Sequence, residues 1–130
     1  MNAEYHNSDQ TILVADDEEA AHFLLDRAFH AAKSSCALRM VTNGEDAINY
    51  LKGRGIYSDR NQYPMPALVL LDLKMPRKDG FEVLKWMREQ PEFKRMVAVM
   101  FSTSDEPQDI TRSYDLGANS FLVKTPLFAE

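Results

Sequence analysis

Five polar residues follow short apolar runs closely, and their types suit phosphoryl chemistry: Asp16, Asp17, Asp72, Ser102 and Lys124. In an open parallel sheet, ligands bind outside the carboxyl ends of the strands, so these side chains are expected to gather at one edge. Three carboxylates placed together repel one another unless a cation lies among them. Magnesium prefers oxygen ligands and is commonly held by one or two carboxylates together with phosphate oxygens. The sequence therefore predicts magnesium-assisted phosphoryl chemistry.

Each kind of side chain suits a different role in that chemistry. Asp72 ends the run 67–71, which is apolar on both alternating faces, as in a central strand of a parallel sheet. A carboxylate there is predicted to be the nucleophile that forms an acyl phosphate. Lys124 is predicted to offset the charge on the phosphoryl oxygens, and the Ser102 hydroxyl to donate a hydrogen bond to one of them.

These residues also have ordinary structural interpretations. Acids such as Asp16 and Asp17 are common at a helix N-terminus, where they satisfy free amides. Ser102 alone is typical of a loop hydroxyl, and Lys124 alone of a solvated strand end. Asp72 is harder to explain in this way, because a charge that ends a fully apolar strand needs a partner. The combination at one sheet edge favours the chemical interpretation.

Five apolar runs alternate with segments of helical spacing, and these are the elements that must position the five side chains. The predicted strands are residues 11–15, 37–41, 67–71, about 97–101 and 120–123. The predicted helices span about 19–33, 45–51, 81–90 and 107–116. Successive parallel strands need crossover connections, which are usually helices. The alternation therefore predicts an α/β protein with a doubly wound, five-stranded parallel sheet.

Helical spacing also predicts which side chains of the first helix face the sheet. Phe23, Leu24, Ala28 and Ala31 recur at intervals of three and four residues, as expected for one packed face. The segment 53–66 contains Gly, Asp, Asn and Pro without sustained periodicity, so it is predicted to be a long loop.

Length and composition indicate one globular domain. The chain has 130 residues, of which 45% are hydrophobic and 27% charged, values near those of ordinary folded domains. The first ten residues are polar, so residues 1–10 are predicted to be a leader and residues 11–130 the domain.

Charge and cysteine content limit the partners and the compartment. The net charge of −5 repels the phosphate backbone, which disfavours DNA and RNA as partners. Cys36 is the single cysteine and cannot form an intramolecular disulfide. The leader has no signal-like apolar segment, and no apolar run is long enough to span a bilayer. A cytoplasmic protein with no membrane partner is predicted.

The order and spacing of these motifs resemble the response-regulator receiver domain of two-component signalling. Asp16-Asp17 is followed by the run Asp72-Leu-Lys-Met-Pro-Arg-Lys-Asp-Gly80, and Ser102 and Lys124 lie thirty and then another twenty-two residues further on. The resemblance covers about Thr11 to Lys124. It implies the flavodoxin-like strand order 2-1-3-4-5. The segment 53–66 and the run Ser102-Thr-Ser-Asp105 are most similar to the small stand-alone regulators associated with bacterial phytochromes.

The resemblance implies a set of metal ligands and a phosphate donor. Asp72 would accept the phosphoryl group from a sensor histidine kinase, a phytochrome-type kinase being one candidate. Asp17 and Asp72 would bind Mg²⁺ directly, Asp16 mainly through water, and the backbone carbonyl of Lys74 would complete the protein ligands.

The resemblance also implies a conformational switch. Ser102 would move toward the phosphoryl group, and Phe121 occupies the aromatic switch position three residues before Lys124. Without the resemblance, a lone aromatic residue on a strand is interpreted as core. Together these features predict a single-domain response regulator that signals through a phosphorylation-driven change of conformation.

Two features depart from the family pattern. Lys124-Thr125-Pro126 replaces the usual Lys-Pro pair, so a cis-proline turn is not assumed. Only six residues follow Lys124, so the sequence is expected to lack the fifth helix of the family. Because that helix shares one face of the sheet with the first, its absence predicts an exposed apolar face, and on it a homodimer or a docked partner, with Leu127 and Phe128 folded into it.

Two alternatives remain open at this point. An aspartate-nucleophile phosphatase also uses magnesium, a hydroxyl and a lysine, but it requires Asp-x-Asp, and Lys74 stands where the second acid would be. The other alternative is an interaction module that keeps the receiver fold without phosphorylation. The complete acidic set argues against it.

Overall fold

The computed structural model describes residues 10–124, and these form alternating strands and helices. The elements are β1 (Thr11–Ala15), α2 (Glu19–Ala31), β2 (Ala37–Val41), α3 (Gly44–Lys52), the short 3-10 helix η1 (Gly55–Ser58), β3 (Leu68–Leu71), α4 (Gly80–Glu89), β4 (Val97–Ser102), α5 (Pro107–Asp115) and β5 (Ser120–Val123). The five strands and four α-helices lie where the sequence predicts them, with differences of one or two residues at their ends.

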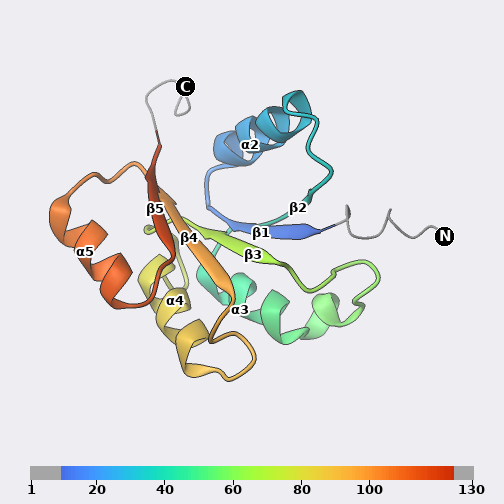
Figure 1. The fold of residues 1–130 in the computed structure, drawn as a ribbon. Helices are drawn as coiled ribbons and strands as arrows, with labels where there is room; N and C mark the ends of the chain where they lie inside the picture. The colour runs from blue at the N-terminus through green and yellow to red at the C-terminus, as the bar shows by residue number, and fades with distance from the viewer. Residues whose placement is uncertain (1–9, 125–130) are drawn as a thin grey trace.

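All five strands are parallel and form one sheet in the order β2-β1-β3-β4-β5. The predicted fold class and strand order are therefore confirmed. Helix α2 lies on one face of the sheet, and α3, α4 and α5 lie on the other (Figure 1). The strand order reverses between β1 and β3, and ligands bind at such a reversal in open α/β sheets.

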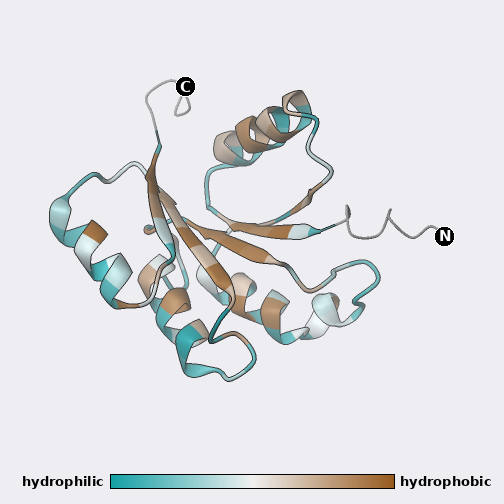
Figure 2. Cartoon of the chain, in the orientation of Figure 1, coloured by the Kyte–Doolittle hydropathy of each residue, from teal (hydrophilic) through white to brown (hydrophobic). Residues whose placement is uncertain are grey.

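The main hydrophobic core lies between the sheet and α3–α5. Alternate side chains of the central strands, such as Val69 and Leu71, are fully buried there, and so are Leu84 and Met87 of α4. Figure 2 shows the matching pattern, with hydrophobic strands and helices that are hydrophobic on only part of their surface. Burial of apolar area is the dominant stabilising contribution for such a core.

The predicted inward face of the first helix is wrong. Phe23 is 61% exposed, and Ala28 and Ala31 are exposed as well, whereas the buried residues of α2 are Ala21 and Leu25. Apolar residues surround most of this helix, so its spacing does not define a unique face.

The segment 53–66 is more ordered than a loop. It contains η1, and the rings of Tyr57 and Tyr63 lie 5.1 and 5.9 Å from that of Tyr50 on α3. The guanidinium of Arg60 donates to the carbonyl oxygens of Tyr50, Leu51 and Tyr63 at 2.7–3.1 Å. These contacts satisfy the C-terminal carbonyls of α3 and fix the connection to β3.

The sheet face on the α2 side is only partly covered in the described part of the chain. In-register partners of a parallel sheet share a face, so Phe101 and Leu122 point to the same side, with Val97 and Val99 along β4. Leu122 is 52% exposed and Val97 is 39% exposed. The expectations for the leader residues 1–9, the Pro126 turn, the fifth helix, Leu127 and Phe128 lie outside the described residues.

Candidate functional site

The ends of β1 and β3 bring the aspartates together. The amide of Asp16 donates to the carbonyl oxygen of Val41 on β2 at 3.1 Å, and the amide of Asp72 donates to that of Ala15 at 3.0 Å. These backbone bonds continue the sheet past the last strand residues. As a result, both carboxylates leave the sheet at the same carboxyl edge, as the sequence predicts.

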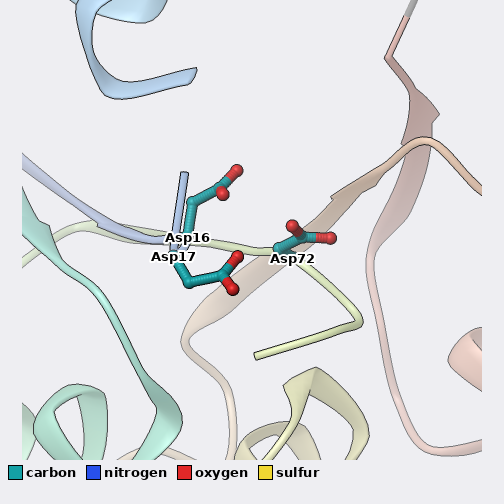
Figure 3. Close-up of side chains that lie close together, drawn as sticks. All are labelled: Asp16, Asp17 and Asp72. Atoms are coloured by element: carbon teal, nitrogen blue, oxygen red, sulfur yellow. The ribbon is translucent and has the colours of Figure 1, made fainter. Parts of the chain in front are cut away.

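The three carboxylates form a compact cluster. Oxygens of Asp16, Asp17 and Asp72 all lie within 4.8 Å of one another, and Figure 3 shows them at the adjacent ends of the two strands. Asp16 and Asp72 are buried, whereas Asp17 is exposed. This set of hard oxygen donors, open to solvent at one side, fits a divalent cation that keeps several waters.

Two adjoining hollows surround the cluster. One has a volume of about 410 Å³ and is lined by Asp17, Leu73, Lys74, Met75 and Asp79. The other, of about 210 Å³, is lined by Asp17, Glu18, Asp72, Lys74, Ser102, Thr103 and Lys124. The structure thus brings Ser102 and Lys124 to the same hollow as the acidic residues. Lys74 lines both hollows, so the residue predicted to offer a backbone carbonyl lies beside the cluster.

Lys124 is a buried cation of the site, in contact with two of the carboxylates. Its buried Nζ atom donates to Asp16 Oδ2 at 2.6 Å and to Asp72 Oδ2 at 3.3 Å. Its amide donates to the carbonyl oxygen of Ser102 at 2.7 Å, which ties the end of β5 to β4. The ammonium therefore partly balances the two buried carboxylates.

Burial and neighbouring charges perturb both partners of this pair. Burial raises the pKa of Asp72 from its ordinary value; Lys124 opposes this rise, while the charge of Asp16 adds to it. Burial alone would lower the pKa of Lys124, but the hydrogen bond to Asp16 and the charge of Asp72 outweigh it, so the net pKa is raised. Lys124 is therefore held charged, and the ionised form of Asp72 is unfavourable by itself.

Ser102 and Phe121 occupy different environments. Ser102 is buried, and its Oγ accepts from the amide of Ser104 at 3.2 Å. Phe121 is half-buried and packs against the core on the α4–α5 side, in register with Met100. Phe121 is not among the residues that line the two hollows. Its role as a switch stays a prediction.

Two contacts of Lys124 are not predicted from the sequence. Its Nζ lies 5.4 Å from the centre of the Phe101 ring and 3.8 Å from Glu18 Oε1. Glu18 follows the two aspartates directly, and Phe101 precedes Ser102, so adjacency to predicted site residues is the signal that identifies them. A cation above an aromatic ring is stabilised by the negative face of that ring.

Helix α4 begins unusually close to the site. The amide of Gly80 donates to the carbonyl oxygen of Leu73 at 2.9 Å, and a Cβ atom at Gly80 would lie 2.2 Å from the carbonyl oxygen of Asp72. A larger residue would push the backbone of Asp72 away, because real Cβ atoms do not approach that closely. Asp79 and Glu82 form a capping box that fixes this helix start.

The comparisons with known proteins agree with this geometry. The model of the response regulator receiver domain family matches residues 12–128. The chain belongs to this family. As a receiver domain it is a signalling protein of phosphorylation-dependent two-component systems, and proteins of this kind bind a divalent metal at an acidic cluster such as the one described above.

Three relatives are especially similar to this receiver domain. Response regulator RPA3017 in red light signalling of R. palustris is 39% identical with a TM-score of 0.85, covering 92% of this chain and 84% of the other. The phosphorylated cyanobacterial phytochrome response regulator RcpA is 33% identical with a TM-score of 0.85, covering 93% and 84%.

The third relative is response regulator Rcp1 of Synechocystis sp., which is 33% identical over 92% of this chain and 79% of its own length. Its Mn²⁺-bound structure has a TM-score of 0.82 at 32% identity and covers 92% of this chain and 87% of that one. The similarity therefore extends across nearly all of the described receiver domain. No helix within residues 10–124 is long and apolar enough to cross a membrane.

Proposed function

We propose that Asp72 accepts a phosphoryl group from a sensor histidine kinase, with Mg²⁺ held by Asp17, Asp72 and the backbone carbonyl of Lys74, and by Asp16 through water. The observation that carries this proposal is the cluster of three carboxylates with the Lys124 ammonium beside two of them. Asp72 is the member at the end of the central strand β3, facing both the other acids and Lys124.

The transfer is a displacement at phosphorus. An oxygen of the Asp72 carboxylate forms the new bond to phosphorus, while the bond to the donor nitrogen breaks and the donor keeps that electron pair. Bound Mg²⁺ would offset negative charge on the phosphoryl oxygens. Lys124 lies 3.3 Å from Asp72 and is available to pair with another of these oxygens. Ser102, which lines the same hollow, donates a hydrogen bond after it turns.

The receiver domain promotes both its own phosphorylation and its own dephosphorylation in this proposal, and it converts no separate substrate. Ser102 and Phe121 form the switch: Ser102 moves toward the phosphoryl group, and Phe121, two strands from Asp72, rearranges with β5.

An interaction module that ignores phosphorylation has no use for an acidic cluster beside a buried lysine. A phosphatase would need a second acid where Lys74 stands.

The experiment that tests this function is metal-dependent labelling. Incubation with the small phosphodonor acetyl phosphate and Mg²⁺ is expected to add one phosphoryl group per chain, measured as a mass increase in the intact protein. A chelator in excess of Mg²⁺ should prevent the increase, because the crowded carboxylates then repel the incoming anion. An interaction module predicts no mass increase under either condition, and a phosphatase predicts continuous turnover of the phosphodonor with no stable label.

The kinase partner is proposed to be of the phytochrome type. The support is the resemblance to red-light and phytochrome response regulators across almost the whole chain.

The net charge of −5 disfavours a nucleic acid as a direct partner. A single cysteine suits a reducing compartment, and a cytoplasmic location without a membrane partner is proposed with it.

Self-association through the partly covered sheet face is also proposed. The face includes Val97, Val99, Phe101 and Leu122, and contiguous apolar surface of this kind usually marks an interface. Light scattering is expected to give a homodimer at micromolar concentration, and Leu122→Asp is expected to give a monomer. Ile56→Asp in η1, where Ile56 is also exposed, should leave the dimer intact. A wild-type mass equal to one chain over a wide concentration range would contradict the proposal.

A further inference from the structure

The loop after β4 contains a chain of hydrogen bonds that starts at Ser102. The amide of Ser104 donates to Ser102 Oγ at 3.2 Å, and the hydroxyl of Ser104 donates to Asp109 Oδ2 at 2.7 Å. The same hydroxyl oxygen accepts from the amide of Glu106 at 3.3 Å. Ser104 therefore joins the Ser102 hydroxyl to the start of α5 through both its backbone and its side chain.

The far end of this chain is firmly anchored. Asp109 lies in the first turn of α5, and its carbonyl oxygen accepts from the hydroxyl of Ser113 at 2.8 Å. Ser113 is fully buried, so this turn is held against the body of the domain. The bond from Ser104 to the Asp109 carboxylate is short and has a charged acceptor, which makes it stronger than a bond between neutral groups.

We propose that Ser104 is a positioning residue whose bond to Asp109 holds the Ser102 hydroxyl away from the phosphoryl site until Asp72 is occupied. This inference rests on the proposed function, because it assigns a regulatory role to the loop that carries Ser102. In the structure the Ser102 oxygen faces the Ser104 amide. To donate to an oxygen on Asp72, the hydroxyl must turn and the loop must yield, which breaks the bond between Ser104 and Asp109.

A bond that exists in only one of two states shifts the equilibrium between them by its own free energy. Because Ser104 and Asp109 are both partly exposed to solvent, the bond still contributes modestly, which corresponds to a change of about 2- to 10-fold in an equilibrium constant. Removal of the bond is therefore expected to tighten the binding of a phosphoryl mimic by that factor. A purely structural bond, present in both states, would lower the stability of both equally and leave the affinity unchanged.

The test is the affinity for beryllium fluoride, which mimics a phosphoryl group on a carboxylate, measured by calorimetry at fixed Mg²⁺ concentration. Ser104→Ala and Asp109→Ala each remove one partner of the bond, and both should bind about 2- to 10-fold more tightly than the wild type. Ser104→Thr keeps the hydroxyl and should stay near the wild-type affinity. Thr111→Ala, an exposed position on the same helix, should also leave the affinity unchanged.

Unfolding in urea with and without beryllium fluoride gives a second readout. The two alanine variants should lose stability mainly in the free state, so the gap in stability between free and bound forms widens relative to the wild type. If the wild type binds beryllium fluoride but both alanine variants bind it no more tightly, the positioning role of Ser104 is wrong. The proposed function would not be affected by that result. A wild-type protein that shows no binding dependent on Asp72 would overturn the proposed function itself.

Discussion

Asp72→Asn is expected to abolish phosphorylation of the protein. The amide is a far poorer nucleophile than a carboxylate, and Asp72 is the acid at the end of β3, the middle strand of the sheet, beside Lys124 and the other two acids. Intact mass after incubation with acetyl phosphate and Mg²⁺ should show no added group, against one added group in the wild type. The loss is expected to be complete within detection.

The matched control is Asp79→Asn. Asp79 is close in sequence and lines the neighbouring hollow, and asparagine preserves the cap that Asp79 provides to α4. This variant should still gain one phosphoryl group. Equal labelling of Asp72→Asn and the wild type would show that another residue accepts the phosphate.

Asp72→Asn should also stabilise the metal-free fold. The folded pKa of Asp72 is raised above its ordinary value of 3.8, so the protonated form is favoured in the folded state. The protonated Asp72 carboxyl therefore stabilises the folded state fully below about pH 4, and this stabilisation is lost as the pH rises through the raised pKa. The variant, which has no ionisable group there, should exceed the wild type by about 1–2 kcal/mol at neutral pH. The difference should shrink on acidification.

Of the substitutions proposed for this protein, Arg88→Met is expected to lower the free energy of unfolding most. The guanidinium of Arg88, at the end of α4, donates five hydrogen bonds, to the carbonyl oxygens of Phe93, Lys94, Met96 and Gly117 and to Asn119 Oδ1. They join α4 to the turn before β4 and the turn before β5. Burial lowers the pKa of Arg88, which reflects its partly desolvated position.

Methionine fills much of the same volume but donates no hydrogen bonds. Phe93 O and Asn119 Oδ1 keep bonds from the backbone amides of Met96 and Ala98, whereas the other acceptors lose the guanidinium donor. Three of the bonds are partly buried and two are exposed, and a partly buried acceptor that loses its donor is costly, so the free energy of unfolding in urea should fall by about 1–3 kcal/mol. Lys85→Met is the control on the exposed face of the same helix, where the ion pair with Glu89 is solvated. It should change stability by less than about 0.5 kcal/mol. A similar small change for Arg88→Met would mean that water replaces the guanidinium without cost.

Local patterns in the sequence were enough to locate the strands, the four α-helices and the side chains that gather at the carboxyl edge of the sheet. A fully apolar run such as 67–71 predicts a central parallel strand. Asp72 comes directly after this run, so it is predicted to lie at the carboxyl edge of the sheet. Because all parallel strands end at the same edge, residues far apart in the chain are predicted to meet without any knowledge of their contacts. The structure confirms this gathering of Asp16, Asp17, Asp72, Ser102 and Lys124.

Contacts that depend on rotation and loop path could not be predicted in this way. Apolar residues surround most of α2, so their spacing does not define its inward face, and the structure buries Ala21 and Leu25 but leaves Phe23 exposed. The segment 53–66 is held by contacts of its Tyr57 and Tyr63 rings with the Tyr50 ring of α3, which no local sequence pattern predicts.

The sequence by itself therefore determined the sheet, its parallel direction and the set of side chains at its edge, since each follows from a local pattern and one geometric rule. Only the tertiary structure decided how these side chains pair: Lys124 with both Asp16 and Asp72, and Ser104 between Ser102 and Asp109. Those pairings depend on ångström-scale distances between loops. Such distances are fixed by the packing of the whole domain and leave no periodic pattern in the sequence.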